Sequence, residues 1–403
     1  MCGIAGFCNF KEDFEENTDY WNFRLEKMRA VLAHRGNDAR GRFLKKHIGL
    51  SHSRLAIRDI LCGDQPMTRT HNGYDYTICY NGEIYNTDEL IPELSENGFV
   101  CSTTSDTEVI LYAYIHWGAD FVNRLNGIFA FAIWDTAKNR LLLYRDRVGV
   151  KPLFYAIRGD SLVFGSEPKA CFAHPAVKPE LDKQGLQELL AIGPAHTSGL
   201  SLFKDLFEVL PGHFMIYSQN GLHDETYWEL TSREHTESYQ DTVAHTRFLV
   251  EDAIKRQMVS DVPVCTFLSG GIDSSIVTAI AANYMNTRGK TLNTFSFDFK
   301  DNDRYFKANA FQPERDLPYV NRMLEEYETA HSYLECDENS LFKALFAAVD
   351  AKDMPGMTDV DSSLLYFCSL VSRKNKVALT GECADEIFGG YPWFYRKELL
   401  ERY

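Results

Sequence analysis

Residues 262–275 form the stretch VPVCTFLSGGIDSS, an apolar run that leads through two glycines into a helix start. Glycine lets the backbone approach a ligand closely, and free N–H groups at the start of a helix face an anion. The loop lacks the lysine of the GxxxxGK[ST] phosphate loop. An ordinary strand-to-helix turn capped by Asp273 or Ser274 is the alternative interpretation.

The sequence around this loop alternates between helical and strand patterns. Residues 241–257 predict a helix, residues 262–268 a buried strand, and the helix after the loop extends to about Met285. Residues 292–299 and 377–379 predict two more strands. This alternation predicts a doubly wound parallel sheet.

An acidic segment follows the last of these strands. Residues 378–391 are ALTGECADEIFGGY, in which Glu382, Asp385 and Glu386 supply three carboxylates. Carboxylates can hold Mg²⁺ against phosphates, and ligands bind at the carboxyl ends of parallel strands. A solvated acidic turn is the alternative.

The first half of the chain has a different pattern, with short strand-like runs between turn residues. Two stretches at helical spacing, residues 22–33 and 106–116, interrupt the runs, and Asp106 is a suitable N-cap. We expect an α+β domain with antiparallel sheets over residues 1–228, and a polar linker begins the second domain at residues 229–403. The predicted strands are residues 76–81, 127–135, 140–145, 162–165 and 213–218.

Length and composition are consistent with two globular domains. The chain has 403 residues, 45% apolar and 13% aromatic residues. The net charge of −15 argues against non-specific nucleic-acid binding, and the longest apolar run, residues 128–134, is too short for a bilayer. The ten cysteines lack metal-site spacing and no secretory signal is visible, so we expect a cytoplasmic protein with reduced thiols.

The first residues of the chain indicate a candidate catalytic nucleophile. If Met1 is removed, Cys2 carries a thiol and an α-amine whose reference pKa of about 8 suits a general base. An incidental buried cysteine is the alternative. Further along, Arg54 suits a carboxylate, Glu83 and Asp106 suit an ammonium, and the neighbouring Asn81–Gly82 can donate to an oxyanion. An isolated N-G-E triplet is more often a turn.

In combination these motifs resemble a known family. MCGIAGF, HRG, HSRLAI, YNGEIYN, SDTEVI, LNGIFAFAIWD, RDRVGVKPLFY and SEPKA occur in the order of class II, N-terminal nucleophile (Ntn) glutamine amidotransferases, most like the asparagine synthase branch. The resemblance implies an Ntn-hydrolase fold of stacked antiparallel sheets between helices, with Cys2 as nucleophile. Asn37 departs from the proline that usually follows HRG. The implied glutamine-binding residues are Arg54, Leu55, Ala56, Ile57, Arg58, Asn81, Gly82, Glu83 and Asp106.

The second half resembles enzymes that split ATP into AMP and pyrophosphate, and residues 378–391 are similar to the SGEGSDE-FGGY motif of asparagine synthases. The resemblance implies that Glu382 assists amination and that Asp273 and Asp385 hold Mg²⁺. Cys383 and Ala384 replace the usual Gly and Ser. The implied ATP-binding residues are Phe267, Ser269, Gly270, Gly271, Asp273, Ser274, Phe297, Thr380 and Gly381.

The expected reaction is ATP-dependent amidation of aspartate to asparagine through β-aspartyl-AMP, with ammonia from glutamine. Residues 353–363 occupy the place of an acceptor loop but hold no arginine, and Asp359 and Asp361 have no assigned role. Family members extend past residue 403 and form dimers, so we expect a truncated synthetase domain and a homodimer.

Two alternatives remain. The first is an amidotransferase for another carboxylate, including a cyclase, although cyclases tend to lose the N-terminal cysteine. The second is a module that senses glutamine or nucleotide without turnover.

Overall fold

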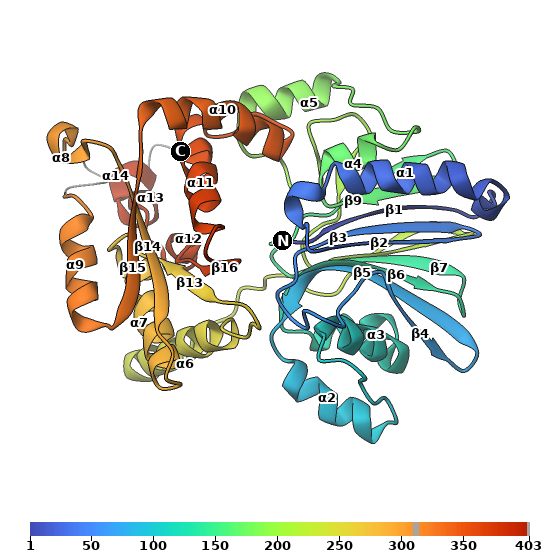
Figure 1. Cartoon of the computed structure of the whole chain (residues 1–403), viewed down its shortest axis with the longest axis horizontal. Helices are drawn as coiled ribbons and strands as arrows, with labels where there is room; N and C mark the ends of the chain where they lie inside the picture. Colours follow the sequence, from blue (N-terminus) through green and yellow to red (C-terminus); the bar gives the residue numbers. More distant parts are fainter. Residues whose placement is uncertain (309–313, 401–403) are drawn as a thin grey trace. The chain divides into compact units, whose positions relative to one another are not determined.

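The computed structural model describes residues 1–308 and 314–400. The chain forms two compact units (Figure 1). Residues 1–234 make up the first unit, together with residues 349–357. The remaining described residues make up the second unit, so the chain leaves that unit once and returns to it.

Two six-stranded antiparallel sheets form the centre of the first unit. One has the order β10-β8-β9-β1-β3-β2 and the other β12-β11-β7-β6-β5-β4. The strands of the first sheet are β1 (Gly3–Asn9), β2 (Ala39–Lys45), β3 (Ile48–Arg54), β8 (Phe154–Arg158), β9 (Ser161–Gly165) and β10 (Phe207–Glu208). Those of the second are β4 (Met67–His71), β5 (Tyr74–Ile84), β6 (Gly127–Asp135), β7 (Arg140–Arg145), β11 (His213–Ser218) and β12 (Gly221–Thr226).

Both faces of each sheet are buried, which explains why the apolar runs in this half are continuous. Successive side chains in a strand point to opposite faces. In β6, Phe131 and Ile133 join a cluster that includes residues of the helix α3 (Asp106–Trp117), whereas Ala130 and Ala132 join a cluster with residues of the other sheet. The interior therefore consists of several apolar layers rather than one core.

Helices close the outer faces of the two sheets. Leu25 and Met28 of α1 (Thr18–Ala30) pack against Phe7 of β1, and α3 covers the outer face of β5 and β6 (Figure 1). The result is the predicted arrangement of stacked antiparallel sheets between helices. The other helices of this unit are α2 (Thr87–Glu96), α4 (Pro168–Phe172) and α5 (Lys183–Gln187), with short 3₁₀ or π turns at Phe14–Asn17, Ala33–Arg35, Ala119–Arg124 and Glu188–Ile192.

The structure corrects one prediction at the start of α3. The N-cap is Ser105, whose side chain accepts a hydrogen bond from the backbone N–H of Thr107. Asp106 is the first helical residue, and its carboxylate accepts hydrogen bonds from the Tyr80 hydroxyl and the Ile84 N–H instead. Ser105 therefore caps the helix, and the Asp106 carboxylate forms its hydrogen bonds in the interior of the unit.

The second unit contains a parallel four-stranded sheet with the order β15-β14-β13-β16. Its strands are β13 (Val264–Phe267), β14 (Leu292–Phe299), β15 (Thr329–Cys336) and β16 (Val377–Leu379). The sequence analysis did not predict β15. Its residues TAHSYLEC are largely polar and only partly buried, because it is an edge strand.

Apolar clusters cover both faces of this sheet, which confirms the doubly wound fold. Met258, Ala281 and Leu292 form a cluster on the α7 side, and Phe367 of α11 packs with Phe295 on the other. The helices are α6 (Tyr239–Arg256), α7 (Ile272–Asn286), α8 (Asn302–Tyr305), α9 (Leu317–Glu326), α10 (Glu338–Lys352), α11 (Thr358–Val371), α12 (Ala384–Phe388), α13 (Pro392–Tyr395) and α14 (Lys397–Leu400).

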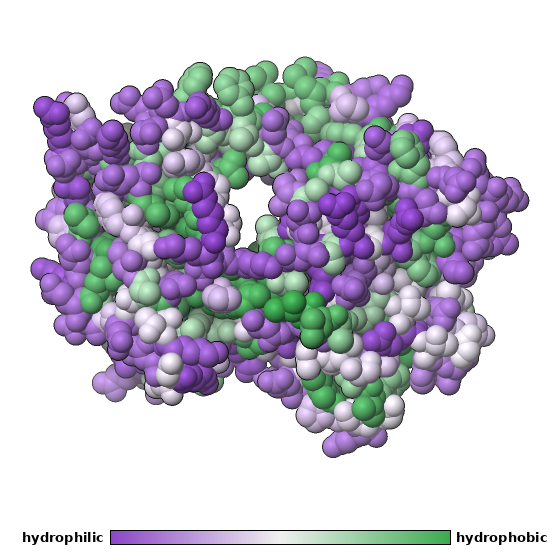
Figure 2. Space-filling view, in the orientation of Figure 1, coloured by the Kyte–Doolittle hydropathy of each residue, from purple (hydrophilic) through white to green (hydrophobic). Residues whose placement is uncertain are grey.

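The surface in Figure 2 is mostly hydrophilic, with scattered apolar side chains. Such single exposed apolar residues are normal for a globular protein. Within the described part of the chain, every helix is too short or too polar to cross a bilayer.

Phe131 offers a direct test of the layered core. Its ring is fully buried and stacks on Tyr144 at a centroid distance of 4.7 Å. We expect Phe131→Ala to lower the free energy of unfolding of this unit by about 3–5 kcal/mol, because it leaves a cavity. Denaturant unfolding followed by near-UV circular dichroism measures the change. The control is Phe23→Ala on α1, whose side chain is 53% exposed. An equal effect of both substitutions would contradict the assigned core.

Candidate functional site

Cys2 lies next to the chain segment that follows β3. The Leu55 N–H donates to Cys2 Sγ at 3.4 Å, and Sγ lies 3.6 Å from the Leu55 carbonyl oxygen. Burial raises the pKa of the Cys2 thiol, and the Leu55 hydrogen bond only partly opposes this. Burial therefore favours the protonated form of this thiol.

An ion-pair network fixes the backbone beside Cys2. Arg35 Nε donates to the Cys2 carbonyl at 2.9 Å, and Arg35 Nη1 lies 2.6 Å from Glu167 Oε1. His34 Nε2 lies 3.0 Å from the same oxygen. Burial raises the pKa of Glu167, but the contacts with His34 and Arg35 outweigh it and lower the pKa to about 2. Glu167 thus remains an anion that anchors Arg35.

Asn81, Gly82 and Glu83 belong to strand β5, which extends three residues beyond its predicted end because residues 82–84 still pair with β6. Asn81 is 1% exposed, and its Nδ2 atom has no hydrogen-bond partner in the described structure. A buried amide donor without a partner costs stability. An acceptor atom of a bound ligand would satisfy this donor.

Two buried acids lie beside this strand. Burial raises the pKa of Asp106, although Arg58 and the hydrogen bonds from the Ile84 N–H (3.1 Å) and Tyr80 hydroxyl (2.8 Å) oppose the shift. Burial and the nearby Asp106 raise the pKa of Glu83 to about 8, against the opposing charges of Arg58 and Lys151. A positively charged ligand group would favour the ionised form of both acids.

A small pocket of about 30 Å³ brings most of the predicted glutamine-binding residues together. Asn81 and Ala56 do not line it, and the Ala56 N–H donates to Asp38 instead. Gly63, Gln65, Tyr80, Ser105 and Thr107 do line it, although the sequence analysis did not select them. The predicted residues in its wall are Cys2, Arg54, Leu55, Ile57, Arg58, Gly82, Glu83 and Asp106.

The guanidinium of Arg54 is turned toward its own loop. Nη1 donates to the Ile60 carbonyl and pairs with Asp64 Oδ1, both at 3.1 Å, and Nη2 donates to the Asp59 carbonyl. The Asp64 side chain is 76% exposed, whereas that of Arg54 is 6% exposed. An exposed carboxylate on a buried guanidinium is a contact that a ligand carboxylate can replace.

In the second unit, the glycine–serine loop joins β13 to α7. Gly270 has φ +84°, and a Cβ atom there would lie 2.8 Å from Tyr319 Cβ, so this position requires glycine. Ser274 Oγ lies 3.0 Å from Ser269 Oγ and 3.2 Å from the Ser269 nitrogen, which folds the loop over the first turn of the helix. Gly271 is the N-cap and lacks a side-chain capping bond, so the alternative interpretation, a turn capped by Asp273 or Ser274, is wrong in its capping residue.

The loop after β16 meets this helix start. A Cβ atom on Gly381 would lie 2.9 Å from the Ser274 nitrogen, so the two loops are in direct contact. Burial and the nearby Asp385 raise the pKa of Asp273. No cluster of three or more metal-ligating side chains occurs among residues 1–308 and 314–400. The Asp273–Asp385 pair still fits Mg²⁺, which is usually held by one or two carboxylates with substrate phosphates.

Glu382 and Cys383 begin the short turn before α12. Glu382 is exposed, and its N–H donates to Thr380 Oγ1 at 3.4 Å. Cys383 has φ +68°, a left-handed conformation that favours glycine. The structure thus explains why the replacement of glycine at this position matters: the cysteine adopts a conformation that is strained for a residue with a side chain.

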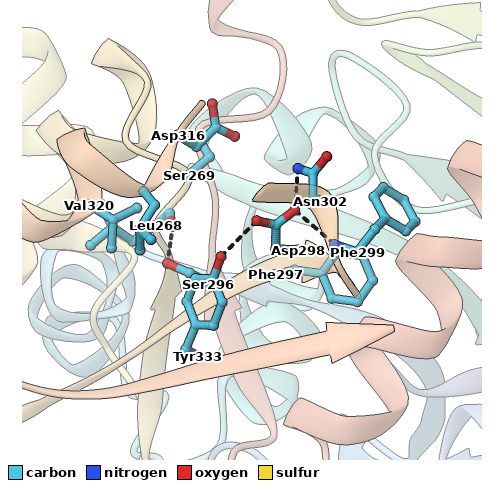
Figure 3. A pocket seen from close by; sticks show the side chains of 11 residues that line it. Leu268, Ser269, Ser296, Phe297, Asp298, Phe299, Asn302, Asp316, Val320 and Tyr333 are labelled. Carbon is cyan, nitrogen blue, oxygen red and sulfur yellow. Dashed lines mark hydrogen bonds between the residues drawn. The ribbon is translucent and has the colours of Figure 1, made fainter. Parts of the chain in front are cut away.

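A cavity of about 170 Å³ opens beside the glycine–serine loop (Figure 3). Ser269 and Phe297 line it, whereas Phe267 packs against Phe367 of α11. Sequence reasoning missed Asp298, which accepts hydrogen bonds from the Tyr333 hydroxyl at 2.8 Å and from Asn302 at 2.6 Å (Figure 3). Its place at the carboxyl end of β14 was the available signal.

The predicted acceptor segment is divided between the two units. Asp353 belongs to the first unit, where Lys169 Nζ lies 3.2 Å from its Oδ1 atom. Asp359 and Asp361 belong to the second unit, in the first turn of α11. The two aspartates can stabilise the helix start, and the structure assigns them no role toward an acceptor.

Glu167 generates a pH-dependent prediction. Its pKa of about 2 lies below the unfolded value of about 4.3, so its stabilisation is present above pH 4 and is lost as the pH falls toward 2. We expect Glu167→Gln to reduce the free energy of unfolding by about 2–3 kcal/mol at pH 7, with a smaller difference below pH 4. Denaturant titrations at several pH values measure this, with the exposed Glu16→Gln as control. A pH-independent difference would contradict the ionic role.

Comparisons with known proteins agree with the two units. Residues 1–228 match the glutamine amidotransferase domain family, and residues 245–403 match the asparagine synthase family. The chain is 48% identical over 99% of its length to asparagine synthetase [glutamine-hydrolyzing] 3 of Bacillus subtilis, and spans 64% of that protein.

Two further relatives give the same result. Asparagine synthetase [glutamine-hydrolyzing] 1 of Bacillus subtilis is 33% identical over 99% of the chain, which spans 60% of it. A putative asparagine synthetase [glutamine-hydrolyzing] 2 of Methanocaldococcus jannaschii is 32% identical over 97% of the chain, which spans 76% of it. These matches confirm the family predicted from the sequence motifs, and the chain belongs to the glutamine-hydrolysing asparagine synthetase family.

Proposed function

We propose that this chain hydrolyses glutamine at Cys2 and uses the ammonia to convert aspartate to asparagine at the expense of ATP. One observation carries the proposal: the pocket that contains the Cys2 thiol also contains two buried acids, and the unpartnered Asn81 amide lies on the strand beside it. A thiol, two neighbouring acids that an ammonium would ionise and an amide donor without a partner match the three parts of a glutamine molecule that must be held during amide cleavage.

Charge complementarity orients the substrate. Glu83 and Asp106 accept the α-ammonium of glutamine, which favours the ionised state of both acids. The α-carboxylate takes the place of Asp64 on the guanidinium of Arg54. The side-chain amide of the substrate then points toward Cys2.

The thiol attacks the amide carbon once its proton is removed. The amine freed by cleavage of Met1 accepts the thiol proton and passes it to the leaving nitrogen, which departs as ammonia. Asn81 Nδ2 and the Gly82 N–H stabilise the oxyanion of the tetrahedral intermediate. Water then hydrolyses the thioester and releases glutamate.

The second unit activates the acceptor. The loop from Ser269 to Ser274 presents hydroxyl and N–H donors to the phosphates of ATP, and the cavity that Asp298 lines accommodates the nucleoside. The aspartate carboxylate attacks the α-phosphorus, pyrophosphate leaves, and ammonia displaces AMP from β-aspartyl-AMP. Asp273 and Asp385 would hold Mg²⁺, which neutralises phosphate charge. Glu382 accepts a proton from the attacking ammonia.

An acceptor other than aspartate is the second candidate. The segment at residues 353–363 contains no arginine to bind an acceptor carboxylate, which favours this alternative. Release of pyrophosphate in the presence of aspartate, glutamate or other carboxylates distinguishes the acceptors, since only the true one stimulates release. We further propose a cytoplasmic location, supported by ten cysteines that are all free thiols.

Cys2 provides the first test. We expect Cys2→Ala to abolish glutamate release from glutamine, because the nucleophile is lost, while added ammonium still supports pyrophosphate release with the acceptor. A coupled glutamate assay and a pyrophosphate assay measure the two reactions separately. Cys368→Ala removes a half-buried cysteine of α11 in the second unit and serves as control for glutamate release. Undiminished glutamate release by Cys2→Ala would refute the glutaminase proposal.

Glu83 provides a test of substrate binding. Its pKa of about 8 in the empty site means that it is mostly neutral at pH 6, so glutamine must displace a proton to bind. We expect KM for glutamine to rise as the pH falls from 8 to 6, by up to about tenfold per unit. Glu83→Gln should raise KM at pH 8 and flatten this dependence. The exposed Glu96→Gln should behave like the wild type, and an unchanged pH dependence in Glu83→Gln would contradict the assignment.

A further inference from the structure

Lys151 is a buried cation that the mechanism above does not use. It lies between β7 and β8, and the residue is 7% exposed. Its ammonium has one hydrogen-bond partner among the residues that the structure describes, the Met1 Sδ atom at 3.0 Å. A thioether is a weak acceptor. A nearly buried lysine is usually paired with a carboxylate, so this arrangement requires an explanation.

The backbone of Lys151 is held firmly. Its N–H donates to Asp146 Oδ2 at 2.9 Å, and its carbonyl accepts from Arg145 Nε at 3.1 Å. Asp146 Oδ1 also accepts a hydrogen bond from the Val150 N–H at 2.9 Å. These bonds fix the main chain on both sides of the residue, so the direction of the side chain toward Met1 is built into the fold.

The charged surroundings of Lys151 belong to the Cys2 site. The titratable groups that act on its ammonium are Arg35, Glu83, Asp146 and the Cys2 thiol, and Lys151 acts in turn on the N-terminal amine. Arg35 is already paired with Glu167 and the Cys2 carbonyl. Lys151 is therefore the cation of this group that has no carboxylate at hydrogen-bonding distance in the described structure.

Removal of Met1 changes what Lys151 faces. The thioether that it contacts is lost, and the new α-amine belongs to Cys2, one residue closer to the thiol. We propose that Lys151 is a positioning residue of the glutaminase centre that holds the Cys2 α-amine in its neutral, proton-accepting form. This inference rests on the proposed function of Cys2.

The physical reason is repulsion between like charges in a site with little water. Burial is the main effect that lowers the pKa of a terminal amine here, and the positive charges of Arg35 and Lys151 add to it. With Lys151 in place, the Cys2 amine therefore binds a proton less readily. The amine can then take the proton from Sγ–H as sulfur bonds to the amide carbon. The same repulsion drives that proton onward to the leaving nitrogen as the carbon–nitrogen bond breaks.

The test compares Lys151→Met, which keeps the length of the side chain but not its charge, with Lys151→Arg, which keeps the charge. All full-length variants are made as fusions cut directly before Cys2, so that each starts with the same free amine, verified by intact mass. Glutamate release is measured from pH 5 to 9.5. The rate of Cys2 alkylation by a glutamine-like chloroketone is measured over the same range.

Two pH profiles are compared, that of glutamate release and that of Cys2 alkylation. We expect the acidic limb of each to shift to higher pH by about one unit in Lys151→Met. The rate should be about tenfold lower near pH 6.5 and should approach the wild-type rate at pH 9. Lys151→Arg should restore the wild-type profile. Lys11→Met removes an exposed cation paired with Asp160 and should leave the profile unchanged.

Unshifted limbs in Lys151→Met, or an equal loss of rate at every pH, would overturn this inference. The failure of the proposed function is distinguishable, because it would appear as absent glutamate release in the wild type. Alkylation requires no turnover, so its pH dependence decides the role of Lys151 in that case as well.

Discussion

The pairing of β1 with β3 is the constraint on which the first site depends. Antiparallel register places Gly3 opposite Ser53, so Cys2, just before the ladder, lies beside the chain segment that leaves β3 and contacts Leu55. A shift of one residue would turn every side chain of β1 to the opposite face. Such a shift would move Phe7 away from the α1 layer, so the packing of the core fixes the position of Cys2.

Burial then determines the chemistry of the charged groups in this site. The same exclusion of water raises the pKa of the Cys2 thiol and of Glu83, and it lowers the pKa of Lys151. Burial therefore disfavours the charged form of each group, and a partner of opposite charge favours it. A ligand that carries both an ammonium and a carboxylate would supply partners for several of these groups at once. Its binding energy would then depend on both charged groups of the ligand rather than on one contact.

Residue patterns predict a strand or helix correctly where the composition of the segment and its packing in the fold favour the same structure. The bounds of β6 and β14 were predicted correctly, because both strands are apolar and are flanked by turn residues. The polar edge strand β15 was missed, because its pairing with β14 comes from the neighbouring strand rather than from its own composition. The contact of Arg54 with Asp64 and that of Lys151 with Met1 depend on loop geometry, which a sequence pattern does not encode.

The chain has a net charge of −15, which disfavours the binding of anionic ligand groups. The two candidate sites offset this charge in different ways. The first site has four cationic side chains in or near it: Arg54 and Arg58 line the pocket, and Arg35 and Lys151 lie near Cys2. The two loops of the second site, residues 268–275 and 380–386, contain no cationic side chain. A polyphosphate there depends on helix N–H groups, hydroxyls and a divalent cation. Burial and the neighbouring Asp385 raise the pKa of Asp273. Two carboxylates this close together would be stabilised by a divalent cation, which a phosphate group would also bind.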